Sequence, residues 1–423
     1  MSRPSRVAGS LWRDRDFGLF WAGRMISLAG SAVTTVVLPI LVYRLTGSAL
    51  QTALLAGIAI LPYLGFGLVA GALADRWDRR RLMIGCDLLN ASLLGTIPLA
   101  AAFGVLTLFQ IYLVAVLSAT AFVWFDAANF GALPTLVGRE RLVVANSYLW
   151  SGETLINILG PSLAGLLAAL LGPAPAIGAD ALSYGLSAAS LLLIRRALHR
   201  PRPAALAGPI YRQTLADIRS GLRFLWQHDL VRALTLLGFG VSLTGGAVAG
   251  LLVVYAVRGL GVPAADARIG LLFTAGAVGA LGASLLLPRL VARLPVPRIT
   301  LVSLLVNPLL LGGMALAPGL AAGLLLYGLW SMSQSLIIMN GIALRQIVTP
   351  EPLLGRVNVT ARMIAWGGTP FGAALGGLLA EAWPIRVTLL VVGLGVLSSA
   401  VVGWLSPLRA AAGIASPPAI GSD

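Results

Sequence analysis

Long apolar runs separated by short polar breaks dominate the pattern along this chain. A helix needs about 20 mostly apolar residues to cross the hydrocarbon core of a bilayer. In residues 82–125, Asp87 is the only charged residue among 44, and the run is long enough for two crossings joined by a turn. Marking all runs predicts twelve spans, at 17–44, 50–74, 83–103, 107–130, 146–171, 174–196, 230–257, 267–288, 297–315, 320–343, 359–381 and 384–406. The pattern therefore predicts an all-α integral membrane protein.

The polar breaks alternate between two kinds. Some are short turns rich in glycine and proline, such as residues 172–175, and the others carry most of the charge. With the N-terminus inside, the predicted inner segments hold 24 arginines and the outer segments hold four. Because positive charge is retained on the cytoplasmic side, this bias predicts a multi-pass protein of the inner (cytoplasmic) membrane with both termini in the cytoplasm.

The spans repeat at half the length of the chain. A shift of 212 residues superposes Asn146 on Asn358 and Gly160 on Gly372, and it matches the order of the polar breaks. We therefore predict two pseudo-symmetric halves of six helices each. The predicted divisions are an N-terminal half at 1–196, a cytoplasmic linker at 197–229, a C-terminal half at 230–408 and a C-terminal tail at 409–423.

The linker contains apolar residues at helical spacing, with arginines between them. These residues are Leu215, Ile218, Leu222 and Leu225. Such a pattern predicts an amphipathic helix that lies on the inner surface of the membrane.

Composition excludes several kinds of function. The chain is 58% hydrophobic and 11% charged, whereas a soluble chain averages about 25% charged residues. Its formal net charge is +15, but the arginines lie between the spans, so we expect no nucleic-acid partner. The absence of lysine disfavours a P-loop for ATP, and two histidines with one cysteine cannot form a Cys/His metal cluster. We predict that the chain is no enzyme and has no cofactor and no metal site.

The segment GALADRWDRRRL, residues 71–82, has six charged residues among the seven from Asp75 to Arg81. It resembles the loop between helices two and three of the major facilitator superfamily, in which a glycine, three residues and Asp-Arg precede a basic pair. The matching residues are Gly71, Asp75, Arg76, Arg79 and Arg80. The resemblance implies a gating loop in which Asp75 pairs with cations when the inner side closes, while Gly71 lets two helices approach closely. A loop that only sets the topology is the alternative.

A second motif, LGPSLAGLL at residues 159–167, resembles the core of the antiporter signature that is typical of exporters in this superfamily. Gly160, Pro161 and Gly165 match it, while Ala164 replaces one glycine. Generic packing of small residues is the alternative. The whole chain is similar to the drug/proton antiporter-like branch that contains macrolide efflux proteins and the enterobactin exporter.

In this superfamily, helices one, four, seven and ten usually line a cavity near the bilayer midplane. Polar and aromatic side chains at helical spacing in three of these helices are candidates for substrate contacts. They are Ser27, Ser31 and Thr34, then Phe122, Phe125 and Asn129, and finally Tyr327, Trp330 and Gln334. An aromatic wall with few polar groups suits a bulky amphiphilic compound better than a sugar.

Three acidic residues, Asp126, Glu153 and Asp180, fall inside predicted spans, where charged groups are rare and usually functional. Glu153 is the preferred proton-coupling residue, because it shares a helix face with Asn157 and because desolvation would raise its proton affinity. A structural hydrogen bond is an equal alternative for Asp180. Asp126 is expected either to be hydrated or to pair with an arginine, and Arg24 is expected to extend toward the inner surface.

Taken together, these features predict a monomeric secondary transporter. It is expected to export lipophilic drugs or secondary metabolites in exchange for protons by alternating access. Its expected partners are a small amphiphilic molecule, protons and the lipid bilayer. Siderophore export and uptake of a small solute are alternatives within transport, and a non-transporting receptor or scaffold is the alternative from another class.

Overall fold

The structure, a computed structural model of the 423-residue chain, describes residues 11–74, 77–199 and 210–410. Within these residues every regular element is helical, and twelve helical segments are long and apolar enough to cross a membrane. Each of the twelve overlaps one predicted span. The predicted all-α membrane fold is therefore confirmed.

The membrane-crossing helices fall on either side of the linker. Before it come α2 (Arg15–Thr46), α3 (Ala49–Ala74), α4 (Arg79–Ala102), α5 (Leu108–Val137), α6 (Leu142–Leu171) and α7 (Pro173–Leu193). After it come α9 (Asp229–Val254), which continues as a π-helical turn, α10 (Ile269–Val291), α11 (Val296–Leu316), α12 (Leu320–Val348), α13 (Leu354–Trp366), α14 (Gly368–Ala382) and α15 (Ile385–Leu405). α13 and α14 together form one crossing. Two further helices, α8 (Ile210–Gln227) and α16 (Pro407–Ala410), are not among the candidate crossings.

Several helices continue past their predicted ends. α5 reaches Val137 where the apolar run suggested residue 130, and α12 reaches Val348 where it suggested 343. The prediction followed the apolar residues, whereas the backbone hydrogen bonds of a helix continue through polar residues until something ends them. For α5 that residue is Gly138, whose φ of 77° lies in the left-handed region that glycine adopts without strain.

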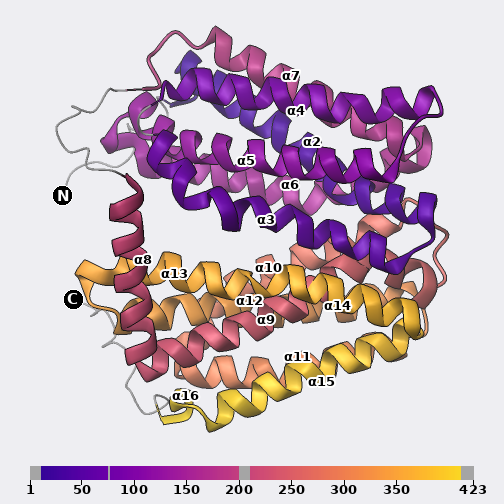
Figure 1. The fold of residues 1–423 in the computed structure, drawn as a ribbon, viewed down its shortest axis with the longest axis vertical. Helices are drawn as coiled ribbons and strands as arrows, with labels where there is room; N and C mark the ends of the chain where they lie inside the picture. Colours follow the sequence, from indigo (N-terminus) through magenta and orange to yellow (C-terminus); the bar gives the residue numbers. More distant parts are fainter. Residues whose placement is uncertain (1–10, 75–76, 200–209, 411–423) are drawn as a thin grey trace. The chain divides into compact units, whose positions relative to one another are not determined.

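The chain packs as two compact units. Unit 1 comprises the residues up to 45, together with 61–207 and 265–274. Within it, α4 packs against both α5 and α7 (Figure 1). Its largest apolar core contains Phe17, Met83, Phe125 and Leu133.

Unit 2 comprises residues 46–60, 208–264 and 275 onward. In this unit α9 packs along α14, and α11 packs against α12 and α15. The core of the unit contains Leu234, Leu301, Leu304 and Ile337.

The predicted linker helix is α8, which crosses the direction of α9 and α13 in unit 2 (Figure 1). Leu225 is buried against Val231 and Val357, and a Cβ atom at Gly221 would lie 2.9 Å from the Arg356 carbonyl oxygen. The C-terminal part of α8 therefore packs on unit 2, and the location of the helix at the inner membrane surface stays a prediction. The side chains of Leu215 and Ile218 lie outside the described part of the chain.

Candidate transport site

Two aspartates inside membrane-crossing helices of unit 1 are completely buried. Asp87 of α4 is 0% exposed and Asp180 of α7 is 1% exposed. α4 and α7 pack along each other, and Tyr184, one turn after Asp180, lies within electrostatic range of both carboxylates and of Arg24. These residues form a buried charged cluster inside unit 1.

Asp180 is held by hydrogen bonds in the contact between α2 and α7. Its carboxylate accepts from the Thr34 hydroxyl and, at 3.2 Å, from the Ser183 hydroxyl. The hydroxyls of Ser31 and Tyr184 are 3.0 Å apart in the same contact. Of the two alternatives for Asp180, the structure therefore shows the structural hydrogen bonds. Two of the predicted cavity residues on α2, Ser31 and Thr34, are engaged in this helix contact, and the third, Ser27, is buried.

Asp87 has no such bonds. Among the described residues, neither carboxylate oxygen of Asp87 and neither polar atom of the Asn90 side chain has a hydrogen-bond partner. The Ser187 hydroxyl interacts with the carboxylate without reaching hydrogen-bond geometry, and Arg24 lies within electrostatic range. Buried polar groups in native proteins are nearly always hydrogen-bonded, so this pair one helical turn apart calls for a functional explanation.

Arg24 of α2 lies inside unit 1, with a side chain only 12% exposed. Its Nη2 atom is 3.7 Å from Oδ1 of Asp126 on α5, and its guanidinium group lies over the rings of Phe122 and Phe125, at 5.8 and 5.4 Å. Asp126 thus pairs with an arginine, which was one of its two expected states. The expectation that Arg24 extends toward the inner surface stays a prediction, and the structure adds that two rings and a carboxylate contact its guanidinium group.

The remaining candidates of unit 1 lie apart from the cluster or at its edge. Glu153 of α6 is exposed and has no hydrogen bond or ion pair within the described part of the chain. Asn157 on the same face is exposed as well. Glu153 was preferred because desolvation would raise its proton affinity, but unit 1 does not bury its side chain. Asn129 of α5 is half-buried, and its side-chain oxygen lacks a hydrogen-bond partner among the described residues.

In unit 2, two of the three candidates on α12, Trp330 and Gln334, belong to a buried hydrogen-bond network. Nε1 of Trp330 donates to Oδ1 of Asn307 at 2.9 Å, and Nδ2 of Asn307 donates to Oε1 of Gln334 at 3.2 Å. Nε2 of Gln334 donates to the Val241 carbonyl at 2.8 Å, which joins α11 and α12 to α9. The Tyr327 ring stacks on Trp330 with centroids 5.7 Å apart. The polar atoms of Trp330 and Gln334 are therefore satisfied within the unit.

Asp87, Asn90 and Asn307 are polar residues that our sequence analysis did not select as site residues. Each is buried in a helix outside the four that were inspected for the cavity. The available signal was a polar residue within a long apolar run, which identifies such positions but not the helix face on which they lie.

In the predicted gating loop, two arginines donate hydrogen bonds to backbone carbonyls of other helices. Nη1 of Arg79 donates to the Gly131 carbonyl of α5 at 2.9 Å. Arg80 donates to the carbonyls of Leu191, at 2.9 Å, and Leu192 at the end of α7, where cations near the last carbonyls stabilise a helix. Both arginines thus tie the start of α4 to other helices of unit 1.

The other residues of this loop have different outcomes. Asp75 and Arg76 lie outside the described residues. Gly71 is exposed, and a Cβ atom there would meet no described atom within 4 Å, so Gly71 does not mediate a close helix approach in this structure. The Asp78 carboxylate accepts from the Arg81 amide at 2.9 Å and caps the first turn of α4.

The antiporter-like motif lies where α6 is closely packed. A Cβ atom at Gly160 would lie 2.7 Å from Cβ of Ala32 on α2, and one at Gly165 would clash with the Ala267 carbonyl oxygen at the start of α10. The carbonyl oxygen of Pro161 lies against Gly270. The Ser162 and Thr274 hydroxyls, 2.8 Å apart, join the same two segments within unit 1. Small residues are needed here because the backbones leave no room for a side chain.

The chain matches known transporters along almost its whole length. A family model described as transmembrane secretion effector matches residues 9–419. The multidrug efflux pump Tap of Mycolicibacterium fortuitum is 28% identical over 416 residues, which cover 92% of this chain and 95% of Tap. The enterobactin exporter EntS of Citrobacter koseri is 29% identical over 382 residues, which cover 87% of this chain and 86% of EntS. The nucleoside transporter NupG, a solved structure 11% identical in sequence, shares the fold with a TM-score of 0.75 over 92% of this chain and 99% of NupG.

Proposed function

Because the chain belongs to the transmembrane secretion effectors of the major facilitator superfamily, we propose that it exports lipophilic organic compounds in exchange for protons by alternating access. The resemblance to this superfamily is confirmed, and the chain is a multi-pass membrane transporter of small molecules, not an enzyme. Proton coupling and the class of compound are the proposed part. The inner membrane with both termini in the cytoplasm is proposed as its location.

The observation that supports proton coupling is the unpaired carboxylate of Asp87. Transfer of an ionised carboxylate into a dry interior without a partner is very costly, so such a group is tolerated there as the neutral acid. Asp87 is fully buried and has no hydrogen bond among the described residues. We assign the transported proton to this residue, with Asn90 as its polar neighbour.

Arg24 supplies a way for the proton affinity of Asp87 to change during transport. It pairs with Asp126 at a loose 3.7 Å and lies within electrostatic range of Asp87. If Arg24 moves from Asp126 toward Asp87 in the opposite conformation, the ionised form of Asp87 gains a cation and the proton is released. A coupled transporter requires such a difference in affinity between its two states.

The surroundings of Asp126 support a lipophilic compound as the substrate. The Asp126 side chain is 53% exposed and Phe122 is 40% exposed, so a carboxylate and an aromatic ring are both accessible at the Arg24 pair. A lipophilic cation could stack on Phe122 and replace Arg24 at Asp126. Binding would then release Arg24 toward Asp87, which would couple substrate entry to proton release. The alternative substrate is an anionic siderophore, which would bind to the positive charge of Arg24 instead.

Purified protein in liposomes tests this proposal. With a pH gradient of one unit, an exchange of one proton for one neutral molecule supports about tenfold accumulation. We expect wild type to accumulate a lipophilic dye under the gradient, and Asp87→Asn to bind the dye and equilibrate it without accumulation. Asp126→Asn should weaken dye binding and should also reduce accumulation, because Arg24 would then be released toward Asp87 in both conformations.

The two parts of the proposal fail in different ways. Wild-type flux that ignores the pH gradient would contradict proton coupling as such. Full accumulation by Asp87→Asn would leave coupling intact and move the proton to another residue. A parallel screen of dyes, macrolides and siderophores would identify the class of compound.

A further inference from the structure

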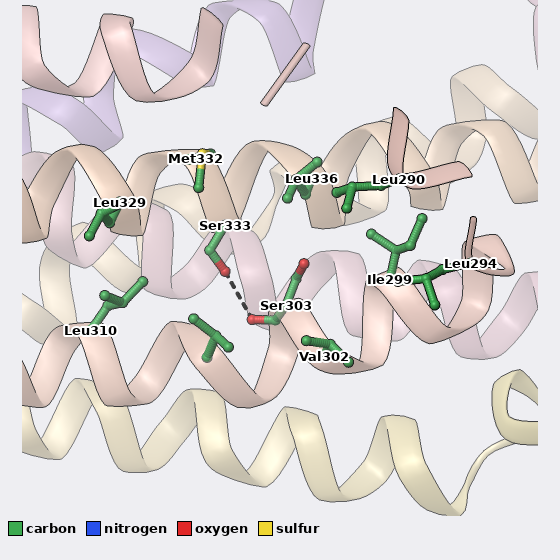
Figure 2. A pocket seen from close by; sticks show the side chains of 11 residues that line it. Leu290, Leu294, Ile299, Val302, Ser303, Leu310, Leu329, Met332, Ser333 and Leu336 are labelled. Atoms are coloured by element: carbon green, nitrogen blue, oxygen red, sulfur yellow. Dashed lines mark hydrogen bonds between the residues drawn. The ribbon is translucent and has the colours of Figure 1, made fainter. Parts of the chain in front are cut away.

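An apolar groove lies between α10, α11 and α12 of unit 2 (Figure 2). Its cavity is about 250 Å³. The lining residues are leucine, isoleucine, valine and methionine, apart from Ser303 and Ser333. The Ser333 hydroxyl donates to the Ser303 carbonyl at 2.9 Å, as the dashed line in Figure 2 shows, so it is already satisfied. The groove therefore offers few polar groups to orient a drug-like molecule, since it has two serine hydroxyls and that of Ser333 is already engaged.

The dimensions of the groove suit a thin apolar chain. Small-molecule sites usually have volumes of about 300–1,000 Å³, which exceed this cavity. Along α11 the lining extends from Ile299 to Leu310, which is about 16 Å at 1.5 Å per residue. That length is close to half of the roughly 30 Å hydrocarbon core, which is one leaflet of a bilayer.

Leu290, Leu294 and Ile299 lie at one end of the groove in Figure 2, and each is next to an arginine in the sequence. Arg289, Arg293 and Arg298 are each adjacent in sequence to a lining residue, and all three are exposed. Among the described residues, Arg293 and Arg298 have no side-chain hydrogen bond or ion pair, and Arg289 has one long bond of 3.3 Å to a carbonyl of its own helix. Guanidinium groups recognise phosphate well. These three are available to a ligand outside the protein.

We infer that this groove binds one anionic phospholipid of the surrounding bilayer. One acyl chain lies along α11 between α10 and α12, and the phosphate group contacts Arg289, Arg293 and Arg298. The arginine bias along the sequence puts this end of the groove on the cytoplasmic side, so the lipid belongs to the inner leaflet.

A second cavity in unit 2 serves as an internal comparison. It is about 330 Å³, lies between α11 and α15 and is also apolar. None of its lining residues, which include Leu305, Pro308 and Leu390, is next to an arginine in the sequence. Apolar surface alone would retain lipids of any headgroup at both places. A preference for anionic lipid is expected only at the groove with the arginines.

Native mass spectrometry of the purified full-length protein tests the headgroup contact, with phosphatidylglycerol and phosphatidylcholine of identical acyl chains as probes. Wild type should retain one phosphatidylglycerol in preference to phosphatidylcholine. The triple change of Arg289, Arg293 and Arg298 to Gln should abolish this preference, with about fivefold weaker phosphatidylglycerol binding per arginine removed. The matched control changes the exposed Arg13, Arg139 and Arg223 to Gln, which removes the same charge elsewhere and should leave the preference intact.

A pair of neighbouring substitutions tests the groove without a change in charge. Val306 lines the groove and is 38% exposed, whereas Leu305 lines the second cavity and is 42% exposed. Val306→Trp should fill the groove and displace the phosphatidylglycerol, and Leu305→Trp should retain it. The inference is overturned if Val306→Trp binds phosphatidylglycerol like wild type, or if the control triple loses the preference equally. It is also overturned if a transported dye displaces the lipid by binding in the groove itself, which would show as dye binding that is lost in Val306→Trp.

Discussion

Asp87 and Asp180 are both buried in unit 1, but their neighbours give them different properties. Asp180 accepts hydrogen bonds from Thr34 and Ser183, which fix the carboxylate in the contact between α2 and α7. Asp87 has no hydrogen bond among the described residues, and its possible cation, Arg24, is shared with Asp126. A group with fixed partners stabilises one arrangement of helices, whereas a group whose partner can change is able to respond to a conformational change.

Thr34→Val tests the structural role of Asp180. The substitution removes the hydroxyl that donates to the carboxylate and retains the shape of the side chain. Hydrogen bonds between helices in membranes contribute about 0.6–1.7 kcal/mol, so we expect a lower midpoint of thermal unfolding in detergent. Thr35→Val is the matched control, because Thr35 is exposed and bonds only to a carbonyl of its own helix within the described residues. Equal unfolding midpoints for the two variants would contradict this role.

Glu153→Gln is expected to retain proton-driven accumulation of substrate close to the wild-type level. Glu153 is exposed on α6 and does not belong to the cluster around Asp87. The same liposome assay with a pH gradient measures the effect, with Asp87→Asn in parallel. Loss of accumulation in Glu153→Gln and retention in Asp87→Asn would reverse the assignment and return the proton to Glu153.

At the level of whole helices, the same type of contact occurs in both units. In unit 1, Gly165 of α6 lies against the start of α10. In unit 2, Gly377 of α14 lies against the start of α3, where a Cβ atom added at Gly377 would be 2.8 Å from Cα of Leu50. These glycines are 212 residues apart, which is the period of the sequence repeat. In unit 2 the amide of Leu50 also donates to Glu381 at 3.1 Å, which strengthens the contact.

Gly165→Ala should destabilise the packing of α6 against the start of α10. The added methyl group would clash with the Ala267 carbonyl oxygen, a backbone atom that cannot rotate away. Overpacking of this kind typically costs about 1–3 kcal/mol, and we expect a lower thermal midpoint and slower transport. Gly185→Ala on α7 is the control, since its Cβ would meet nothing within 4 Å. If both variants unfold at the wild-type midpoint, the close approach is not important for stability.

The helices could be predicted from the sequence because a membrane span needs a long apolar run, and a window of about 20 residues averages out individual exceptions. The partners of single residues could not be predicted in the same way. Asp87 was visible as the one charge in its run, but nothing in the run shows that it lies beside Arg24 and Tyr184 from two other helices. Gly71 matched a family motif, yet its surroundings are open. Such contacts depend on how helices rotate and pack, which hydrophobic periodicity does not specify when all sides of a helix are apolar.

At the scale of the whole molecule, the distribution of arginine predicts how the chain is oriented in the membrane. The predicted inner segments hold 24 of the 30 arginines. Some of these arginines have local partners in the structure, as Arg79 and Arg80 show by their hydrogen bonds to carbonyls of α5 and α7. The three near the apolar groove are proposed to hold a lipid of the inner leaflet. The predicted orientation of the chain therefore underlies both the proposed transport direction and the proposed lipid site.

Cysteine labelling measures this orientation directly. The single native cysteine, Cys86, is buried and is first replaced by serine. A cysteine in place of Arg139 should then react with a membrane-impermeant maleimide only from the cytoplasmic side, and one in place of Val105 only from the outside.

Both positions are exposed in the structure, Val105 at 63%. They flank α5, whose 30 residues are about 45 Å long at about 1.5 Å each, so one bilayer separates them. Arg139 is one of 24 inner arginines, and its loss leaves the bias unchanged in sign. Labelling from the reverse sides would contradict the orientation and place the proposed lipid in the outer leaflet.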